Sequence, residues 1–177
     1  MKTIRWGVIG PGRIAHKFVQ DLAKVPGSTL SAVASRSLDR AQAFANEYGA
    51  PYAYGSYEAL LECPELDVVY VASPHNGHLR HTLLCIKASI PVVCEKPFSI
   101  NECYVGDMIE MAETFDTYLM EALWTRFMPT TRHALSLVQQ GVIGEVLGVK
   151  ADFGFKGIYD PESRLFNPKL AGGALLD

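Results

Sequence analysis

The sequence predicts an α/β fold whose N-terminal part is a doubly wound parallel sheet. Short apolar runs of strand length alternate with segments of helical spacing throughout residues 1–122. The first apolar run, residues 3–9, leads directly into the glycine turn GPGRIA at 10–15, and a helical pattern follows over 16–24. A strand, a glycine turn and a helix in this order are typical of the first unit of such a sheet.

The glycine turn has the pattern G-x-G-x-x-A of the dinucleotide-binding, or Rossmann, fingerprint. Gly10 permits the tight turn, Gly12 lacks the Cβ that would block a pyrophosphate, and Ala15 keeps the helix close to the sheet. We expect the diphosphate on the backbone N–H groups of Arg13 and Ile14, where the helix dipole favours negative charge. The alternative is a glycine turn that only connects a strand to a helix. The fingerprint is favoured because the turn lies directly between the first strand and a helix, as in dinucleotide-binding units.

The next elements follow from turn residues and periodicity. Pro26 and Gly27 mark a turn before a strand over 30–34. Residues 37–48 then repeat apolar side chains at helical spacing, and Gly49 ends that helix. Each of these segments has the length that a strand or helix of an α/β unit requires.

The alternation continues to residue 122. A short strand over 51–54 precedes a brief helix over 56–61, which Ser56 caps. The continuous apolar run 68–72 predicts a strand that is covered on both faces. The same criteria predict helices over 78–88 and 101–115 and strands over 91–94 and 118–121. Ligands of such a sheet bind beyond the carboxyl ends of its strands.

The pattern changes after residue 122, and we expect two domains: residues 1–122 bind the dinucleotide, and residues 123–177 begin a second domain. A helix over 125–140 is entered through Pro129, and alternating large and small residues over 146–155 predict a strand of a second sheet. A lone strand with an unpaired edge is not stable. We therefore expect the chain to be part of a longer protein and to be inactive alone.

Composition favours a small-molecule ligand. The chain is 49% hydrophobic, carries a net charge of −3 and has no run of Lys or Arg, which argues against nucleic acid and an anionic membrane as partners. No apolar run approaches the roughly 20 residues of a membrane helix, so we expect a cytoplasmic protein. The four cysteines include no C-x-x-C, which favours reduced thiols over disulfides or a metal site.

The residues after the second strand favour NADP over NAD, although NAD remains possible. A carboxylate at this place binds the ribose hydroxyls of NAD, whereas this chain has Ser35 and Arg36. A hydroxyl and a planar, permanently charged guanidinium suit a 2′-phosphate. The alternative is that Arg36 is a solvated loop residue and that Asp39 binds the ribose.

Glu95 and Lys96, followed by Pro97, form the second polar group on the ligand edge. Core packing explains this charged pair poorly, since the preceding residues 92–94 already fill the core. Lys96 is the candidate catalytic residue, because an ammonium beside the nicotinamide can exchange a proton with a substrate hydroxyl or orient it. The alternative is a surface ion pair between Glu95 and Lys96.

Three histidines, His75, His78 and His81, follow Ser73 and Pro74. Their spacing does not place three ligands on one helical face with a carboxylate, so we predict no metal site. We expect Ser73, Pro74, His75 and His78 to lie near the cofactor instead.

Aromatic and basic residues follow the sixth strand. Trp124 and Arg126 are candidates for cofactor contact, and Trp124 and Phe153 are candidates for the wall of a substrate pocket. An apolar hinge contact between domains is the alternative.

Several of these motifs together resemble the glucose-fructose oxidoreductase and inositol dehydrogenase (Gfo/Idh/MocA) family. They are the G-x-G-x-x-A turn, the Ser-Pro loop followed by His78, the triplet EKP at 95–97 and the ending GGALLD at 172–177. Within that family, MEALWTRFMP at 120–129 looks most like the branch of dihydrodiol dehydrogenases and NADP-dependent D-xylose dehydrogenases.

The resemblance implies a two-domain enzyme of about twice this length, with a predominantly antiparallel open sheet in the second domain that often mediates homodimerisation. It implies that Lys96 and Asp177 are catalytic and that a Tyr or His at position 181 completes the set. The implied reaction is NAD(P)-dependent hydride transfer to or from a secondary alcohol of a trans-dihydrodiol or an aldose such as D-xylose. A catalytically silent nucleotide-sensing or regulatory protein of the same fold is the alternative.

Overall fold

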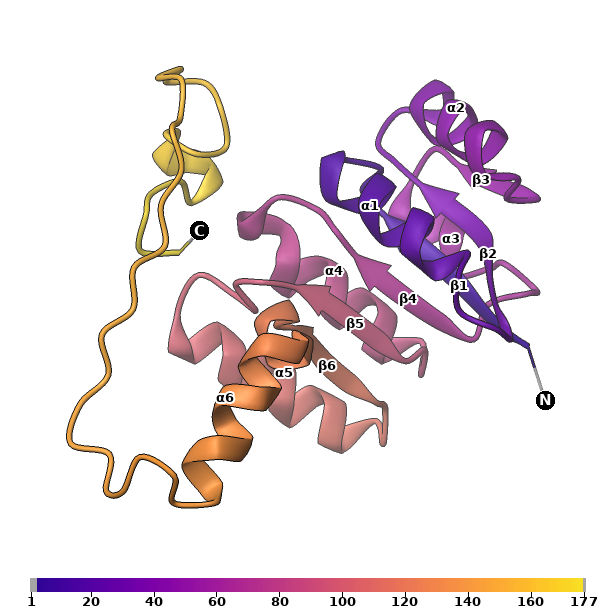
Figure 1. The fold of residues 1–177 in the computed structure, drawn as a ribbon. Coiled ribbons are helices and arrows are strands. Elements are labelled where there is room, and N and C mark those ends of the chain that lie inside the picture. The colour runs from indigo at the N-terminus through magenta and orange to yellow at the C-terminus, as the bar shows by residue number, and fades with distance from the viewer. Residues whose placement is uncertain (1–2, 177) are drawn as a thin grey trace.

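The computed structural model describes residues 3–176 and contains a six-stranded parallel sheet with the strand order β3-β2-β1-β4-β5-β6 (Figure 1). Every strand pair is parallel. The strands are β1 (Ile4–Ile9), β2 (Ser28–Ala34), β3 (Tyr52–Tyr54), β4 (Val68–Val71), β5 (Val92–Glu95) and β6 (Leu119–Ala122). The predicted doubly wound sheet is confirmed, and its strand order reverses between β1 and β4, which is where such sheets bind ligands.

The helices alternate with these strands, as the periodicity predicted. They are α1 (Arg13–Leu22), α2 (Leu38–Tyr48), α3 (Tyr57–Leu60), α4 (His78–Lys87), α5 (Glu102–Thr114) and α6 (Pro129–Gln139). Short 3₁₀ turns lie at η1 (His75–Gly77), η2 (Trp124–Phe127) and η3 (Pro168–Leu170). Ser37 and Ser56 cap α2 and α3 through their hydroxyls, and Gly49 ends α2 in the left-handed conformation.

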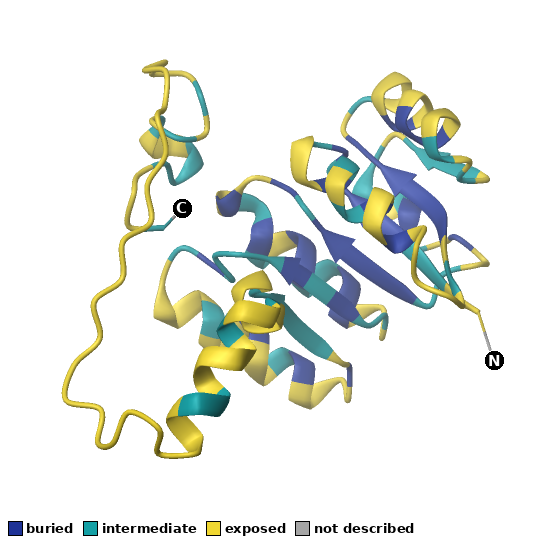
Figure 2. Cartoon of the chain, in the orientation of Figure 1, coloured by how far each residue is buried: buried dark blue, intermediate teal, exposed yellow. Residues whose placement is uncertain are grey.

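Each face of the sheet has its own apolar core. On one face, Val8, Val33 and Tyr70 of the strands pack with residues of α1 and α2. On the other face, residues such as Ile9 and Val71 pack with α3, α4 and α5. Figure 2 shows the central strands buried between helices whose outer sides are exposed. Side chains therefore alternate between two covered faces, which explains why the strands read as continuous apolar runs.

The part of the chain after β6 differs from the prediction in two respects. The predicted strand over 146–155 is wrong, because these residues have no regular secondary structure and are exposed throughout (Figure 2). A strand needs a neighbour for its N–H and C=O groups, and none of the described residues pairs with this segment. The predicted helix over 125–140 begins only at Pro129, since the preceding residues form the 3₁₀ turn η2.

Within residues 3–176, no helix has both the length and the apolar character that spanning a membrane requires.

The four cysteines are free thiols, and Cys63, Cys85 and Cys94 are buried whereas Cys103 is exposed. Burial raises the pKa of the Cys85 and Cys94 thiols to about 12, so neither forms a reactive thiolate at neutral pH. Cys103 is therefore the cysteine that a reagent in solution reaches in the folded protein.

We predict that iodoacetamide modifies one thiol of the native chain and all four after denaturation. Intact-mass spectrometry checks this. Cys103→Ser is the control, since it should remove the native modification and leave the slow, unfolding-dependent modification of the other three. Rapid native modification of the Cys103→Ser variant would contradict the buried positions of the core thiols.

Candidate active site at the carboxyl edge of the sheet

The strand register brings the ends of four strands to one level. Ile9 pairs with Ala34 of β2 and with Val71 of β4. Val71 pairs in turn with Cys94 of β5. The residues that follow these positions therefore share the carboxyl edge of the sheet: the glycine turn, Ser35, Ala72 with Ser73, and Glu95 with Lys96. The structure thus brings together the four loops that the sequence singled out.

Gly10 is required by the fold itself. Its φ is +86°, a conformation that L side chains rarely adopt. A Cβ at this position would lie 3.0 Å from the Ala72 carbonyl oxygen and 3.0 Å from the Ser73 amide nitrogen. The Ala72 amide also donates to the Ile9 carbonyl at 2.8 Å. Gly10 therefore lets the glycine turn lie directly against the end of β4.

Neither backbone conformation nor crowding by the described residues requires a glycine at position 12. Its backbone is extended, with φ −100° and ψ −175°. Among the described residues, the nearest atom to a Cβ there is the Gly10 carbonyl oxygen at 4.0 Å. The space in front of Gly12 is open, as a pyrophosphate requires.

The N-terminal turn of α1 has the features of an anion-binding site. Within the described chain, no side chain caps the first turn of α1 and no acidic residue lies in it. Ala15 is fully buried, which holds this end of the helix against the sheet. The N–H groups of the first turn and the positive end of the helix dipole therefore face the open space at Gly12. These residues fit the diphosphate of a dinucleotide.

The loop after β2 has a buried hydroxyl and an exposed cation. Ser35 is buried, and its hydroxyl oxygen accepts a hydrogen bond from the Ser37 amide at 3.3 Å. Ser37 in turn accepts from the Arg40 amide and caps α2. Arg36, between the two serines, is exposed. The loop is thus held by its serines while the guanidinium remains available to solvent or ligand.

The loop after β5 is tied to the sheet through carboxylates. One oxygen of Glu95 accepts a hydrogen bond from the Tyr70 hydroxyl of β4, and the other accepts from the Lys96 amide at 3.1 Å. Glu121 of β6 accepts from the Phe98 amide at 2.9 Å. Two carboxylates thus hold the backbone on either side of Pro97.

His78 connects this loop to the loop after β4. The His78 side chain is fully buried, and its ring nitrogens lie 2.8 Å from the carbonyl oxygens of Pro97 and Ser73. A carbonyl oxygen only accepts, so a ring nitrogen that carries a proton donates to the carbonyl beside it. His78 fixes the spacing of two loops of the candidate site and does so from inside the protein.

The other two histidines have different surroundings. His81 lies 2.8 Å from the Ser73 hydroxyl, and burial together with nearby Arg80 lowers the pKa of His81 to about 4, so its ring is neutral at pH 7. His75 is buried in η1, where the guanidinium of Arg164 approaches its Nε2 at 3.4 Å. In residues 3–176, no three His, Cys, Asp or Glu side chains are placed to hold a metal ion.

The remaining candidates are not gathered into one pocket. Trp124 and Arg126 lie in η2, directly after β6, and both are exposed. Phe153 is 79% exposed and contacts Phe155 of its own segment. Asp177 lies outside the described residues. The structure therefore brings the candidate cofactor-binding loops together at one edge of the sheet, whereas the candidate substrate-pocket residues Trp124 and Phe153 are exposed.

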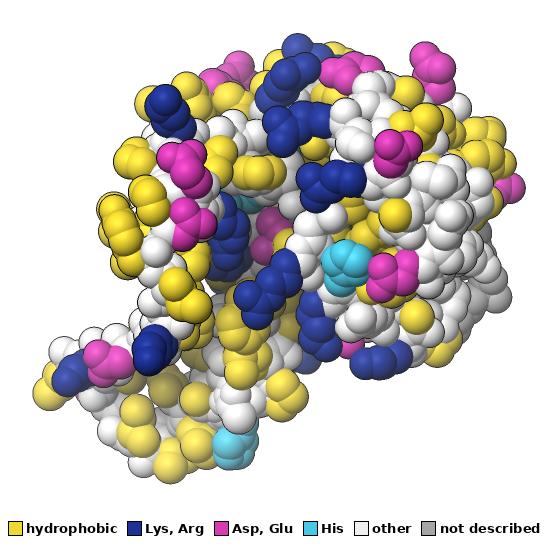
Figure 3. All heavy atoms as spheres, turned by 90° about the horizontal axis from the view of Figure 1, so that it is seen from above, with side chains coloured by type: hydrophobic (Ala, Val, Ile, Leu, Met, Phe, Trp, Pro, Cys, Tyr) yellow, Lys and Arg dark blue, Asp and Glu magenta, His cyan; other side chains and the backbone are white. Residues whose placement is uncertain are grey.

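Charge on this side of the molecule suits an anionic ligand. The strands in Figure 1 point toward the upper left, and the view from above in Figure 3 shows Lys and Arg side chains around a hollow. An acidic side chain is visible inside that hollow (Figure 3). Cations at the rim of a concave surface attract phosphate groups.

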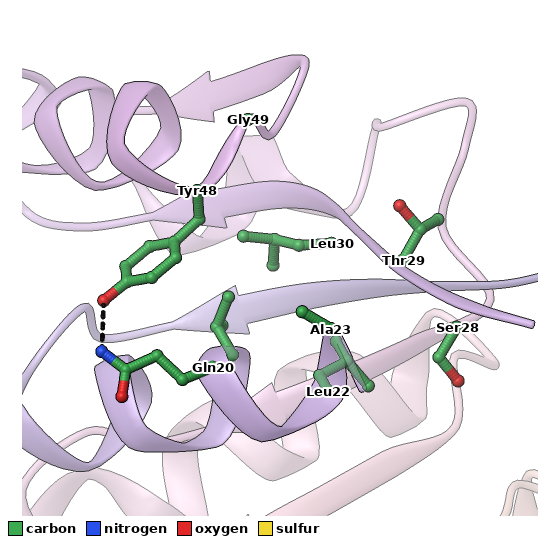
Figure 4. A pocket seen from close by; sticks show the side chains of 9 residues that line it. Gln20, Leu22, Ala23, Ser28, Thr29, Leu30, Tyr48 and Gly49 are labelled. Atoms are coloured by element: carbon green, nitrogen blue, oxygen red, sulfur yellow. Dashed lines mark hydrogen bonds between the residues drawn. The ribbon is translucent and has the colours of Figure 1, made fainter. Parts of the chain in front are cut away.

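A groove of about 400 Å³ between α1, α2 and the start of β2 is a different feature. Figure 4 shows Gln20 donating to the Tyr48 hydroxyl at 3.3 Å beside this groove. Ser28 and Thr29, which also line it, are the first residues of β2. The groove therefore lies at the amino edge of the sheet, opposite the glycine turn.

Sequence analysis missed two residues of the candidate site, Tyr70 and Glu121. Tyr70 lies within the apolar run 68–72 and Glu121 ends the predicted strand 118–121, and nothing in their local sequence marks them. The signal that would have found them is the register, which places each beside the end of β5.

Comparisons with known proteins agree with this geometry. A family model described as an oxidoreductase family with an NAD-binding Rossmann fold matches residues 4–122. The chain is 45% identical to trans-1,2-dihydrobenzene-1,2-diol dehydrogenase of Danio rerio over 177 residues, covering 99% of this chain and 52% of the relative. It is 39% identical to the enzyme of that name from Homo sapiens, with 99% and 52% covered. The chain thus spans about half the length of the curated relatives it matches.

Solved structures share the fold. The 3-ketoreductase KijD10 from Actinomadura kijaniata in complex with NADP has a TM-score of 0.75 at 32% identity, covering 81% of this chain and 46% of that one. The apo scyllo-inositol dehydrogenase from Lactobacillus casei has a TM-score of 0.76 at 24% identity, covering 81% and 44%, which shows likeness in fold alone.

The two glycines of the turn give a matched pair of variants. Gly10→Ala should lower the free energy of unfolding by about 1–3 kcal/mol, because the Cβ would meet the β4 backbone at a positive φ. Gly12→Ala should change stability by less than about 0.5 kcal/mol and weaken NADPH binding at least about tenfold. Urea unfolding and NADPH fluorescence titration measure the two effects. Undiminished NADPH binding by Gly12→Ala would contradict the assignment of the diphosphate site.

Proposed function

Because the chain belongs to the Gfo/Idh/MocA family of oxidoreductases with an NAD-binding Rossmann fold, we propose that the full-length protein is an NADP-dependent dehydrogenase. Its substrate is a secondary alcohol of a trans-dihydrodiol or of an aldose such as D-xylose. One observation carries the proposal. Gly12, Arg36 and Lys96 come after β1, β2 and β5, and the strand register aligns the carboxyl ends of these strands along one edge of the sheet. A dinucleotide whose diphosphate lies at Gly12 spans that edge in both directions.

Support for NADP comes from the loop after β2. Ser35 and Ser37 hold the backbone, and no carboxylate occupies the position that follows Ala34, where NAD-binding proteins place one. The exposed Arg36 guanidinium supplies a planar donor set that matches a phosphate. The similar 3-ketoreductase was solved in complex with NADP, which is consistent with a preference for NADP here.

The proposed chemistry depends on a fixed Lys96. NADP, when bound, supplies the nicotinamide that exchanges a hydride with the substrate carbon. Lys96 follows Glu95 at the same edge, and its backbone is held by Glu95 while Glu121 holds the Phe98 amide of the same loop. We assign to the Lys96 ammonium the orientation of the substrate hydroxyl and the stabilisation of charge on that oxygen.

The second unit is proposed to begin at residue 123. In support, neither η2 nor α6 contains a buried residue, whereas every helix before them does. We assign to this unit the remaining walls of the substrate pocket, including Trp124 and Phe153, and the residue expected at position 181, together with Asp177.

Arg36→Ala should weaken NADP binding about tenfold or more and change NAD binding less than about twofold, because NAD lacks the 2′-phosphate. Isothermal titration of the full-length protein with each cofactor measures this. Arg132→Ala, on the exposed surface of α6, removes the same charge and should leave both affinities unchanged. Equal losses for NADP and NAD would remove the argument from the phosphate.

Lys96→Met should lower kcat about a hundredfold or more with NADP and either trans-dihydrodiol or D-xylose, while the Kd for NADP changes little. Steady-state kinetics of the full-length protein measures the first effect and fluorescence titration the second. Lys87→Met is the control, since this exposed lysine ends α4 and therefore lies at the opposite edge of the sheet. An unchanged kcat in Lys96→Met would show that the catalytic assignment is wrong.

A further inference from the structure

Tyr70 is a polar residue in an otherwise apolar layer. It lies on β4, is only 1% exposed, and belongs to the core that packs against α1 and α2. Its ring stacks on Phe18 of α1, with ring centroids 3.9 Å apart and an angle of 16° between the planes. A phenylalanine would fill this place equally well, so packing does not explain the hydroxyl.

Among the described residues, the hydroxyl of Tyr70 has one hydrogen-bond partner. It donates to Oε1 of Glu95, the last residue of the neighbouring strand β5. Burial and the adjacent carboxylate raise the pKa of Tyr70, so the phenol keeps its proton and remains a donor throughout the physiological range. A hydrogen bond from a buried neutral donor to a carboxylate is among the stronger contacts in proteins.

The contact continues from Glu95 into the loop after β5. Oε2 of Glu95 accepts from the Lys96 amide at 3.1 Å. A carboxylate fixed at one oxygen presents the other oxygen in one direction, so the hydroxyl of Tyr70 determines where the Lys96 amide is held. A continuous path of contacts therefore connects α1 to the loop through Phe18, Tyr70 and Glu95.

We infer that Tyr70 is a positioning residue for Lys96, acting through Glu95. This inference rests on the proposed function, in which Lys96 must be held beside the substrate hydroxyl. Phe18 comes from the helix whose N-terminus receives the diphosphate, and Lys96 acts at the nicotinamide. The stack and the hydrogen bond therefore connect the helix of the proposed diphosphate site to the loop of the proposed nicotinamide site through the protein interior.

The first test measures the position of Lys96 without using activity. In the full-length Tyr70→Phe protein, hydrogen exchange of the Lys96 amide should become about tenfold faster, because Glu95 loses the donor that fixes its carboxylate. The Phe98 amide, which donates to Glu121, is the control within the same loop and should change less than about twofold. NMR-detected exchange of both amides gives the ratio.

The second test measures the effect on the reaction. Tyr70→Phe should lower kcat about tenfold and leave the Kd for NADP within about twofold of the wild type. In a Glu95→Ala background, Tyr70→Phe should cause no further loss of kcat, because its effect passes through Glu95. A purely structural role of Tyr70 would instead lower kcat by the same factor in both backgrounds.

Phe18→Leu is the matched control for packing. It removes the ring stack and keeps the hydroxyl, so it should lower the melting temperature and leave the ratio of Lys96 to Phe98 exchange unchanged. Should Tyr70→Phe fail to fold, Glu95→Ala is the second route, since it removes the oxygen that accepts from the Lys96 amide, and exchange should again be faster at Lys96 alone.

Unchanged Lys96 exchange in Tyr70→Phe, or in Glu95→Ala where that variant is needed, would overturn the inference even in a fully active enzyme. Faster Lys96 exchange in a protein that reduces no NADP with either alcohol would support the positioning contact and overturn the proposed function. The two proposals therefore fail separately.

Discussion

The close approach of β1 and β4 at Gly10 sets the position of every other part of the candidate site. Only a residue without a Cβ lets the glycine turn lie within van der Waals distance of Ala72 and Ser73. The strand register then gives β1, β2, β4 and β5 a common level, as the pairs Ile9 with Ala34, Ile9 with Val71 and Val71 with Cys94 show. Because parallel strands all end on one edge, four loops far apart in the sequence share one surface.

A shared edge does not by itself hold loops rigidly, and here the interior supplies the missing constraints. His78 fixes the carbonyls of Ser73 and Pro97, and Glu121 fixes the Phe98 amide. These contacts use polar groups that are wholly or partly buried, for which the loss of a partner is costly. The backbone around Lys96 is therefore held from β6 and α4 as well as from its own strand.

Sequence analysis predicted the sheet, its helices and the loops of the candidate site, because local patterns carry that information: apolar runs, caps such as Ser56, and the glycine turn. It was wrong about a strand over 146–155. Alternating large and small side chains indicate which face of a strand would be apolar, but they carry no information on whether a partner strand exists. It missed the contact between Tyr70 and Glu95 for a related reason. These residues meet because β4 pairs with β5. The register between two strands is a property of the whole fold and cannot be predicted from the residues on either side of one position.

Gly10 and Gly12 separate what the fingerprint contributes to the fold from what it contributes to a ligand. Gly10 has a positive φ and a crowded neighbourhood, so the protein needs it whether or not a dinucleotide binds. Gly12 has ordinary extended backbone and open space, so the fold alone gives no reason for it. A residue whose identity the folded chain does not explain points to something outside the chain, and at the positive end of α1 the chemistry that fits is an anion. The dinucleotide assignment therefore rests on Gly12 and the helix behind it more than on the glycine pattern as a whole.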